Sequence, residues 1–337
     1  MNSTTLKTPA SGSAFPGAGL LSRLGGDLLL PAALVALLLG FGWAEPRILS
    51  ADNLGNLAVQ ASYLVIFATA QVFVLVVRGF DLSLGTLVSL ASVSAVMVMT
   101  AVAPQAGEGV ATLAAVAWIG LLGCAWGAFN GLGVAVLRVN PFIATLATTN
   151  IALGLATTIS GGFPVEGVTP QLRLLLDEAH PAGMPVAVLI TLALTGLAHW
   201  LLQRTVLGRA WYLIGGNPRA AHVAGLPVRR YMVLAYMACA CYAGIGALML
   251  TARAGSGEPN LGGNLTMEAI AAAVIGGASL RGGSGGVSAA VLGALVITVL
   301  SNGMNLVQVD GYLQQITLGA VIIIALFADR LRNKGTR

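Results

Sequence analysis

Two carboxylates lie against long apolar runs, where a charge is costly, and their chemistry could be to carry a proton or to contact a polar solute. Asp81 precedes one such run, and Ser83 falls in the expected first helical turn. Asp81 fits an N-cap at a membrane edge, and it also fits a re-entrant turn beside a polar pathway. Glu268 is the only carboxylate placed in or near the hydrocarbon. It fits a functional intramembrane group or a first-turn residue that complements the helix dipole.

Amide side chains form a second group of polar residues in apolar surroundings. Asn130 and Asn302 are each followed by glycine, and Asn150 lies inside another apolar run. Such amides either hydrogen-bond between packed helices or line a polar path. The candidate path residues are Asp81, Ser83, Asn130, Asn150, Glu268 and Asn302.

The chain lacks the residue sets of common catalytic and metal sites. A phosphate-cradling P-loop needs Gly-Lys-Ser/Thr, whereas Lys7 follows Leu6 and Lys334 follows Asn333. The three histidines have no ligand spacing, and no nucleophile motif supports a catalytic pair. We therefore expect no catalytic residue, no metal site and no cofactor bound by this chain.

Composition predicts the elements that must position these residues. Of 337 residues, 57% are hydrophobic and 9% are charged, against about 25% charged in soluble domains. Apolar runs of about 20 residues mark membrane-spanning helices. The runs are 28–44, 54–77, 82–103, 110–137, 142–159, 184–202, 231–251, 265–280, 287–309 and 312–327. The predicted fold is all-α, a polytopic membrane protein of about ten transmembrane helices.

Charge predicts the orientation of this single transmembrane domain, 27–330. If the N-terminus is cytoplasmic, all but three of the 17 lysines and arginines lie inside, the exceptions being Arg47, Arg173 and Arg253. This asymmetry follows the positive-inside rule. A flexible cytoplasmic leader at 1–26 and a cytoplasmic tail at 331–337 complete the predicted organisation. The basic charge thus reflects topology in membrane lipid, and no nucleic-acid partner is expected.

Short patterns recur in the same order in both halves. Segments 79–85 and 277–283 each follow an apolar run, and Asn-Gly pairs follow at 130–131 and 302–303, although the spacing differs by about one helix. This order predicts two related halves, which are typical of transporters whose path lies between the repeats.

Two further patterns concern packing and the membrane surface. Gly123, Gly127 and Gly131 share one helix face, a spacing that predicts close packing against a neighbouring helix. Trp43, Trp200 and Trp211 are expected in the interfacial aromatic belt.

The cytoplasmic segment 204–230 contains a small helix with clear end signals. Asn217 can cap it, Pro218 suits the first helical position, and Gly225 can take the left-handed conformation at its end. A helix of two turns is too short to be stable alone in water. A solvated basic loop explains the charges of the segment but not these end signals, whereas docking into a cytoplasmic protein explains both.

Together these segments resemble the membrane permeases of ribose-type ABC importers, which carry monosaccharides and related polyols. The resemblance covers nearly the whole chain from about residue 50 onward. It rests on GFDLSLG at 79–85, NPFIATLATTNIALGLA at 140–156, GGNPRAAHVAG at 215–225, TMEAIAAAVIGGASLRGGSGG at 266–286 and NGMNLVQVDGYLQQITLGAVIIIAL at 302–326. Arg78 and Phe80 depart from it, because smaller or aliphatic residues more often flank the Asp-Leu-Ser motif.

The resemblance implies partners for the capped helix. It makes this element a coupling helix, seated in a separate ATPase, whose coupling residues are Gly216, Asn217, Pro218, Arg219, Ala220, Ala221 and Gly225. It also implies a tandem P-loop ATPase that uses ATP and Mg²⁺, a second permease subunit, identical or paralogous, and a periplasmic sugar-binding protein at the bacterial inner membrane. The expected function is import of a ribose- or xylose-like sugar or a polyol by alternating access. The alternative is an ion-coupled secondary transporter in which Glu268 or Asp81 carries a proton.

Overall fold

Backbone polar groups within lipid must be satisfied internally, and an α-helix does this within one segment. The computed structural model is accordingly helical over the part it describes, with one isolated β-bridge between Val165 and Gly257. It describes residues 18–332 and, of their side chains, those of Leu28 and of residues 30–324.

Thirteen α-helices lie within the described residues, several of them short and peripheral. They are α1 (Ala18–Ala44), α2 (Ala51–Val76), α3 (Leu84–Ala106), α4 (Glu108–Ala135), α5 (Pro141–Ser160), α6 (Pro170–Arg173), α7 (Val186–Arg204), α8 (Val206–Gly216), α9 (Pro218–Val223), α10 (Val228–Ala254), α11 (Leu265–Ile275), α12 (Val287–Leu306) and α13 (Gly311–Arg332). Short 3₁₀ or π turns lie at Pro46–Leu49, Leu174–Glu178 and Pro181–Gly183.

Every predicted apolar run coincides with a helix. Seven helices, α2, α3, α4, α5, α7, α10 and α12, are long and apolar enough to cross a membrane. Shorter apolar helices at Leu30–Ala44, Leu265–Ile275 and Gly311–Ile324 occupy the other three runs. A multi-pass helical membrane protein is therefore established, while ten crossings and cytoplasmic termini stay predictions.

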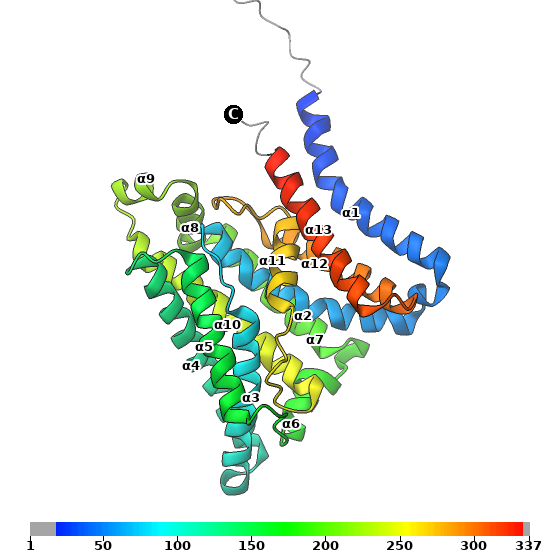
Figure 1. Ribbon diagram of the computed structural model, residues 1–337, viewed down its shortest axis with the longest axis vertical. Coiled ribbons are helices and arrows are strands. Elements are labelled where there is room, and N and C mark those ends of the chain that lie inside the picture. Colours follow the sequence, from blue (N-terminus) through cyan, green and yellow to red (C-terminus); the bar gives the residue numbers. More distant parts are fainter. Residues whose placement is uncertain (1–17, 333–337) are drawn as a thin grey trace, which may run out of the picture.

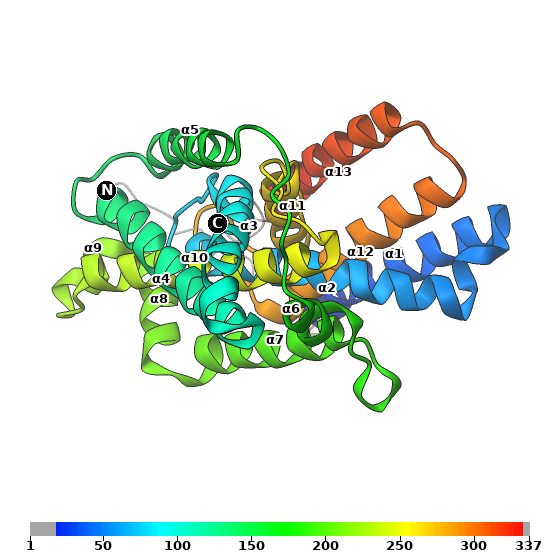
Figure 2. The same cartoon turned by 90° about the horizontal axis from the view of Figure 1, so that it is seen from below.

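Helix α2 lies at the centre of the bundle. Its apolar window is 89% buried, and α7, α10, α11 and α12 all pack against it. Figure 2 shows α5 and α13 on one side of the molecule and α7 on the other, with α2 and α10 between them. A helix that is apolar on all sides belongs inside a bundle, and the sequence of α2 meets that condition.

The glycine face of α4, which includes Gly123, confirms the predicted close packing. An added Cβ on Gly131 would lie 2.7 Å from the Cα of Val233 in α10, and one on Gly127 would meet the backbone of Met237. The two helix backbones can approach this closely because no side chain separates them.

Helix α11 is only half a span. Its 11 residues rise about 16 Å, half of a hydrocarbon core of about 30 Å. The preceding segment runs along α3 toward the start of that helix, because the Glu258 amide donates to Ser92 Oγ at 3.1 Å and the Gly262 amide to Ser89 Oγ at 3.0 Å. Helix α11 therefore begins inside the bundle. Irregular backbone is tolerated at such depth where protein covers it.

Two predicted boundaries differ from the structure, because α1 begins within the expected leader and α13 continues to Arg332 in the expected tail. Helix α1 begins at Ala18, so residues 18–26 of the expected leader are helical, in a stretch that includes three leucines, which are good helix formers. The rest of the leader, 1–17, and residues 333–337 of the expected tail lie outside the described residues.

Candidate functional site

The predicted coupling segment contains a capped helix, α9. Asn217 Oδ1 accepts hydrogen bonds from the backbone amides of Arg219 at 3.1 Å and Ala220 at 3.0 Å. Pro218 occupies the first helical position, and Gly225 has a φ of +83°. All three end signals predicted from the sequence are confirmed.

Helix α9 projects from one corner of the bundle (Figure 1). It packs against its chain neighbours α8 and α10. Ala221 is buried on the inner side of the helix, whereas Val223 is 88% exposed at its tip. A helix this short needs tertiary contacts to be stable, and its free side leaves an apolar contact open to a partner.

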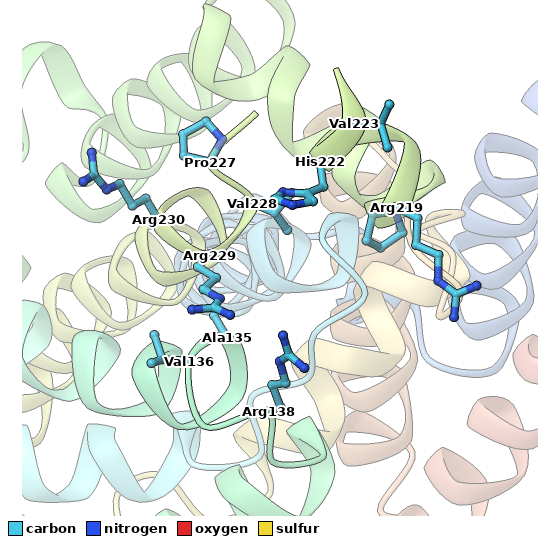
Figure 3. Close-up of a pocket in the computed structure, with 11 residues that line it drawn as sticks. Ala135, Val136, Arg138, Arg219, His222, Val223, Pro227, Val228, Arg229 and Arg230 are labelled. Carbon is cyan, nitrogen blue, oxygen red and sulfur yellow. The ribbon is translucent and has the colours of Figure 1, made fainter. Parts of the chain in front are cut away.

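A basic cleft of about 1150 Å³ lies between α9, the end of α4 and the start of α10 (Figure 3). Its lining includes His222 and four arginines, Arg138, Arg219, Arg229 and Arg230, and no carboxylate. None of these arginines forms an ion pair within the described residues. The cleft is therefore complementary to an acidic surface.

Helix α8 fixes the base of α9 to the bundle. The sequence predicts segment 204–230 as a cytoplasmic coupling loop with one small helix, but most of its first half is this further helix, α8. Thr205 caps α8, and its Oγ1 accepts from the amide of Gly208 at 3.1 Å. Trp211 is fully buried, so its predicted place in the interfacial belt is wrong. Its Nε1 donates to the Tyr231 carbonyl at 2.7 Å, and the Tyr212 hydroxyl donates to the Gly285 carbonyl at 2.7 Å.

Three candidate path residues, Asp81, Ser83 and Asn130, meet in one buried cluster. Asp81 Oδ1 accepts from the Ser83 amide at 2.9 Å and from its hydroxyl at 2.6 Å. Asn130 Nδ2 donates to Ser83 Oγ at 2.9 Å and lies 3.4 Å from both Asp81 carboxylate oxygens. Trp126 Nε1 donates to the same hydroxyl at 3.1 Å, and Gln71 Nε2 donates to the Asp81 carbonyl at 2.7 Å.

This cluster joins the α2–α3 connection to α4. All three candidates are at most 1% exposed, so they do not face an open path in this conformation. The chain after α2 turns back beside Gln71, so Asp81 is a buried turn residue in this structure, and its place relative to the membrane stays a prediction. A path role for these residues stays a prediction that would require the cluster to open.

Glu268 lies in different surroundings. It lines a cavity of about 220 Å³ between α11, α12 and α13, together with the polar side chains of Asn264 and Gln315. Its first-turn position in α11 is confirmed. Because α11 begins inside the bundle, this carboxylate lies at depth and beside open space, and a path role for it stays a prediction.

The remaining candidates lie elsewhere. Asn150 is exposed on α5, and its Nδ2 donates to the Leu146 carbonyl of the same helix at 3.0 Å. Asn302 Oδ1 accepts from Asn53 Nδ2 at 3.0 Å, at the start of α2. Neither belongs to the Asp81 cluster.

The segments on which the predicted repeat is based take different positions in the two halves of the structure. The loops holding 79–85 and 277–283 meet at the same end of α2, because the Gly283 amide donates to the Val76 carbonyl at 2.9 Å. Asn130 contacts the connection after α2, whereas Asn302 contacts its first turn. Asn302 lies in α12, the first helix after the second loop, whereas Asn130 lies in α4, the second helix after the first loop. The two related halves stay a prediction.

Comparison with known proteins assigns the chain to a family. A family model described as "Branched-chain amino acid transport system / permease component" matches residues 53–326. The chain belongs to this family of ABC transporter permeases. Its ribose-type character, expected from the motifs, is supported by the names of the curated relatives.

Three curated relatives illustrate the similarity. The ribose import permease protein RbsC of Escherichia coli K12 is 35% identical over 89% of this chain and 92% of its own. The D-allose transport system permease protein AlsC of the same strain is 34% identical over 92% of both chains. The probable ABC transporter permease protein y4mJ of Sinorhizobium fredii NGR234 is 35% identical over 94% of both. No solved structure matches.

Proposed function

We propose that this permease forms the translocation path of an ATP-driven importer for a monosaccharide, such as a ribose- or xylose-like sugar, or for a related polyol. A separate ATPase would drive alternating access in the permease. The observation that carries this proposal is α9, a capped two-turn helix that projects from the bundle and is fixed at its base by α8.

The basic cleft beside α9 supports an ATPase partner with an acidic docking surface. The cleft carries four arginines without a lining carboxylate, and such a concentration of one sign of charge attracts an oppositely charged surface. ATP and Mg²⁺ would then be bound by the partner, a tandem P-loop protein, and not by this chain.

The opposite end of the bundle supports docking of a periplasmic sugar-binding protein. Glu108 at the start of α4 is exposed at that end, as are Glu166 and Asp310 in the connections. Asp177 pairs with Arg253 at 3.2 Å and orders the connection after α5. The bias of lysine and arginine away from this end supports the proposed placement in a bacterial inner membrane with cytoplasmic termini.

A second permease subunit, identical or paralogous, would complete the path. Helix α5 is poorly covered, with only 22% of its apolar window buried, and it exposes Asn150 and Thr158 within an apolar surface. A polar residue on such a face suits a path shared with a second copy better than contact with lipid.

The names of the relatives support the substrate class. They specify ribose, D-allose and, for a Haemophilus influenzae relative, galactose and methyl galactoside. The family description names branched-chain amino acids instead, so the substrate proposal depends on the individual relatives.

The alternative function is ion-coupled secondary transport. Glu268 favours it, because this carboxylate lines a cavity and has no ion-pair partner within the described residues. Asp81 is the second candidate proton carrier.

Reconstitution tests both functions. The permease is inserted into vesicles with a candidate tandem ATPase and a candidate sugar-binding protein, and uptake of labelled ribose, xylose, allose and galactose is measured. The proposal predicts uptake with ATP on the α9 side and none with an ATPase variant lacking its P-loop lysines. Uptake that follows a proton gradient without the ATPase would instead establish the alternative.

A further inference from the structure

Three distant segments meet beside the base of α9: the end of α2, the end of α8 and the loop between α11 and α12. The Gly283 amide donates to the Val76 carbonyl at 2.9 Å. A Cβ on Gly283 would lie 2.8 Å from the Gly216 nitrogen, and a Cβ on Gly215 would meet both Val76 and Gly283. We call this contact of residues 76–78, 215–216 and 282–283 the junction.

Arg78 supplies the side-chain bonds of the junction. Its Nε donates to the Gly215 carbonyl at 2.5 Å, and its Nη2 donates to the Gly216 carbonyl at 2.6 Å. These carbonyls are at the end of α8, where no further helical turn supplies a donor. A planar guanidinium suits this fork, because its N–H groups have fixed directions.

The backbone of Arg78 adds a second observation. Its φ is +64°, a left-handed conformation that glycine adopts more easily than any residue with a Cβ. A Cβ on Gly282, whose φ is +77°, would meet the Arg78 side chain. The junction therefore holds an arginine where backbone strain alone would favour glycine, and Gly282 leaves room for its side chain.

The junction lies between the predicted coupling helix and the two carboxylates Asp81 and Glu268. Helix α8 ends at Gly216, and only the capping residue Asn217 joins it to α9. Arg78 precedes the buried turn with Asp81, and Gly282 follows α11, whose first turn contains Glu268. A displacement of α9 that moves α8 would thus reach α3 through one loop and α11 through the other.

We propose that Arg78 is a positioning residue that transmits movement of α9 to the α2–α3 turn and, through the junction, to α11. This inference rests on the proposed function, since it requires an ATPase acting on α9. Arg78 touches no solute; it acts by holding the end of α8 against the two loops.

The test measures ATP hydrolysed and solute transported per assembled importer in reconstituted vesicles. Arg78→Ala should lower transport about tenfold or more, in the range of ordinary coupling between sites, while hydrolysis stays close to the wild-type rate. Arg78 is an exposed residue, so its truncation leaves no core cavity. Arg78→Lys keeps the charge without the planar fork and should lie between wild type and Arg78→Ala.

Two further variants separate coupling from other effects. Arg78→Gly relieves the left-handed strain but removes the fork, and it should uncouple as strongly as Arg78→Ala. Arg281→Ala is the matched control, since Arg281 is exposed in the neighbouring loop and its side chain forms no hydrogen bond within the described residues; it should keep the wild-type ratio.

Three results would overturn the role of Arg78: a wild-type ratio of hydrolysis to transport in Arg78→Ala, recovery of that ratio in Arg78→Gly, or a loss of assembled importer with the ratio unchanged. Absence of ATP-driven uptake in the unsubstituted importer would contradict the proposed function itself, and it is distinguished by appearing without any substitution.

Discussion

Asn53 and Asn302, 249 positions apart, exchange side-chain hydrogen bonds between the start of α2 and the end of α12. Asn53 Nδ2 donates to Asn302 Oδ1 at 3.0 Å, and Asn302 Nδ2 lies 3.3 Å from Asn53 Oδ1. Asn53 Nδ2 also donates to the Ile48 carbonyl at 3.0 Å. The pair joins two core helices at the end of the bundle opposite α9.

Alanine at either asparagine should lower the free energy of unfolding by about 1 kcal/mol, because it leaves the other amide without its partner. The double variant should cost less than the sum of the single ones. Thermal unfolding of the purified chain in detergent measures all three. If Asn302 instead lines the path, Asn302→Ala alone will reduce transport, and Asn53→Ala will not reproduce the defect.

The close α4–α10 contact predicts that a methyl group added at a contact glycine of α4 lowers stability, whereas one added elsewhere on α4 does not. Gly127→Ala should destabilise the protein by about 1–3 kcal/mol, because the new Cβ would meet the Met237 backbone and force the helices apart. Gly133→Ala is the matched control on the same helix, since nothing lies within 4 Å of its added Cβ. Unfolding midpoints compare the two variants, and equal midpoints would contradict the close contact.

Helix positions could be predicted because lipid demands long apolar runs, and charged or glycine-rich segments interrupt them in the sequence. The exception is α11. The apolar run extends to residue 280, but the helix ends at Ile275, because Gly276 and Gly277 let the chain turn and Gly277 has a φ of +96°. Hydropathy alone does not distinguish a half-span from a full one.

Some site residues could likewise be predicted from the sequence, and others could not. The ends of α9 depend on Asn217, Pro218 and Gly225. Each acts on the backbone of its own turn, so the sequence alone predicts these ends. The Arg78 guanidinium bonds Gly215 and Gly216, which are 137 and 138 positions away in the sequence. No local pattern indicates such a pairing. The only sequence signal was that Arg78 departs from the family motif.

Substitution of Asp81 separates a structural role from a proton-carrying one. Asp81→Asn keeps an oxygen that can accept from the Ser83 amide, so stability and ATP-driven uptake should stay close to wild type. Asp81→Ala removes the acceptor and leaves buried donors unpaired, at a cost of about 1–3 kcal/mol. Uptake and unfolding are measured in parallel. Loss of uptake in a stable Asp81→Asn protein would favour the ion-coupled alternative.

If α9 couples the ATPase to the path, changes at its ends should reduce transport without preventing membrane insertion. Asn217→Ala removes the acceptor of two amides at the helix start, at a cost of about 1 kcal/mol, and Gly225→Val forces a β-branched residue to a φ of +83°. Space around Gly225 is open, so the second effect is conformational rather than a clash. Both variants should insert normally and hydrolyse ATP with the partner while transport falls about tenfold.

Gly255→Val is the matched control, because Gly255 also has a left-handed φ, +74°, and open space, but it ends α10 at the other end of the bundle. It should lose similar stability and remain coupled, whereas wild-type transport in Gly225→Val would exclude α9 as the coupling element.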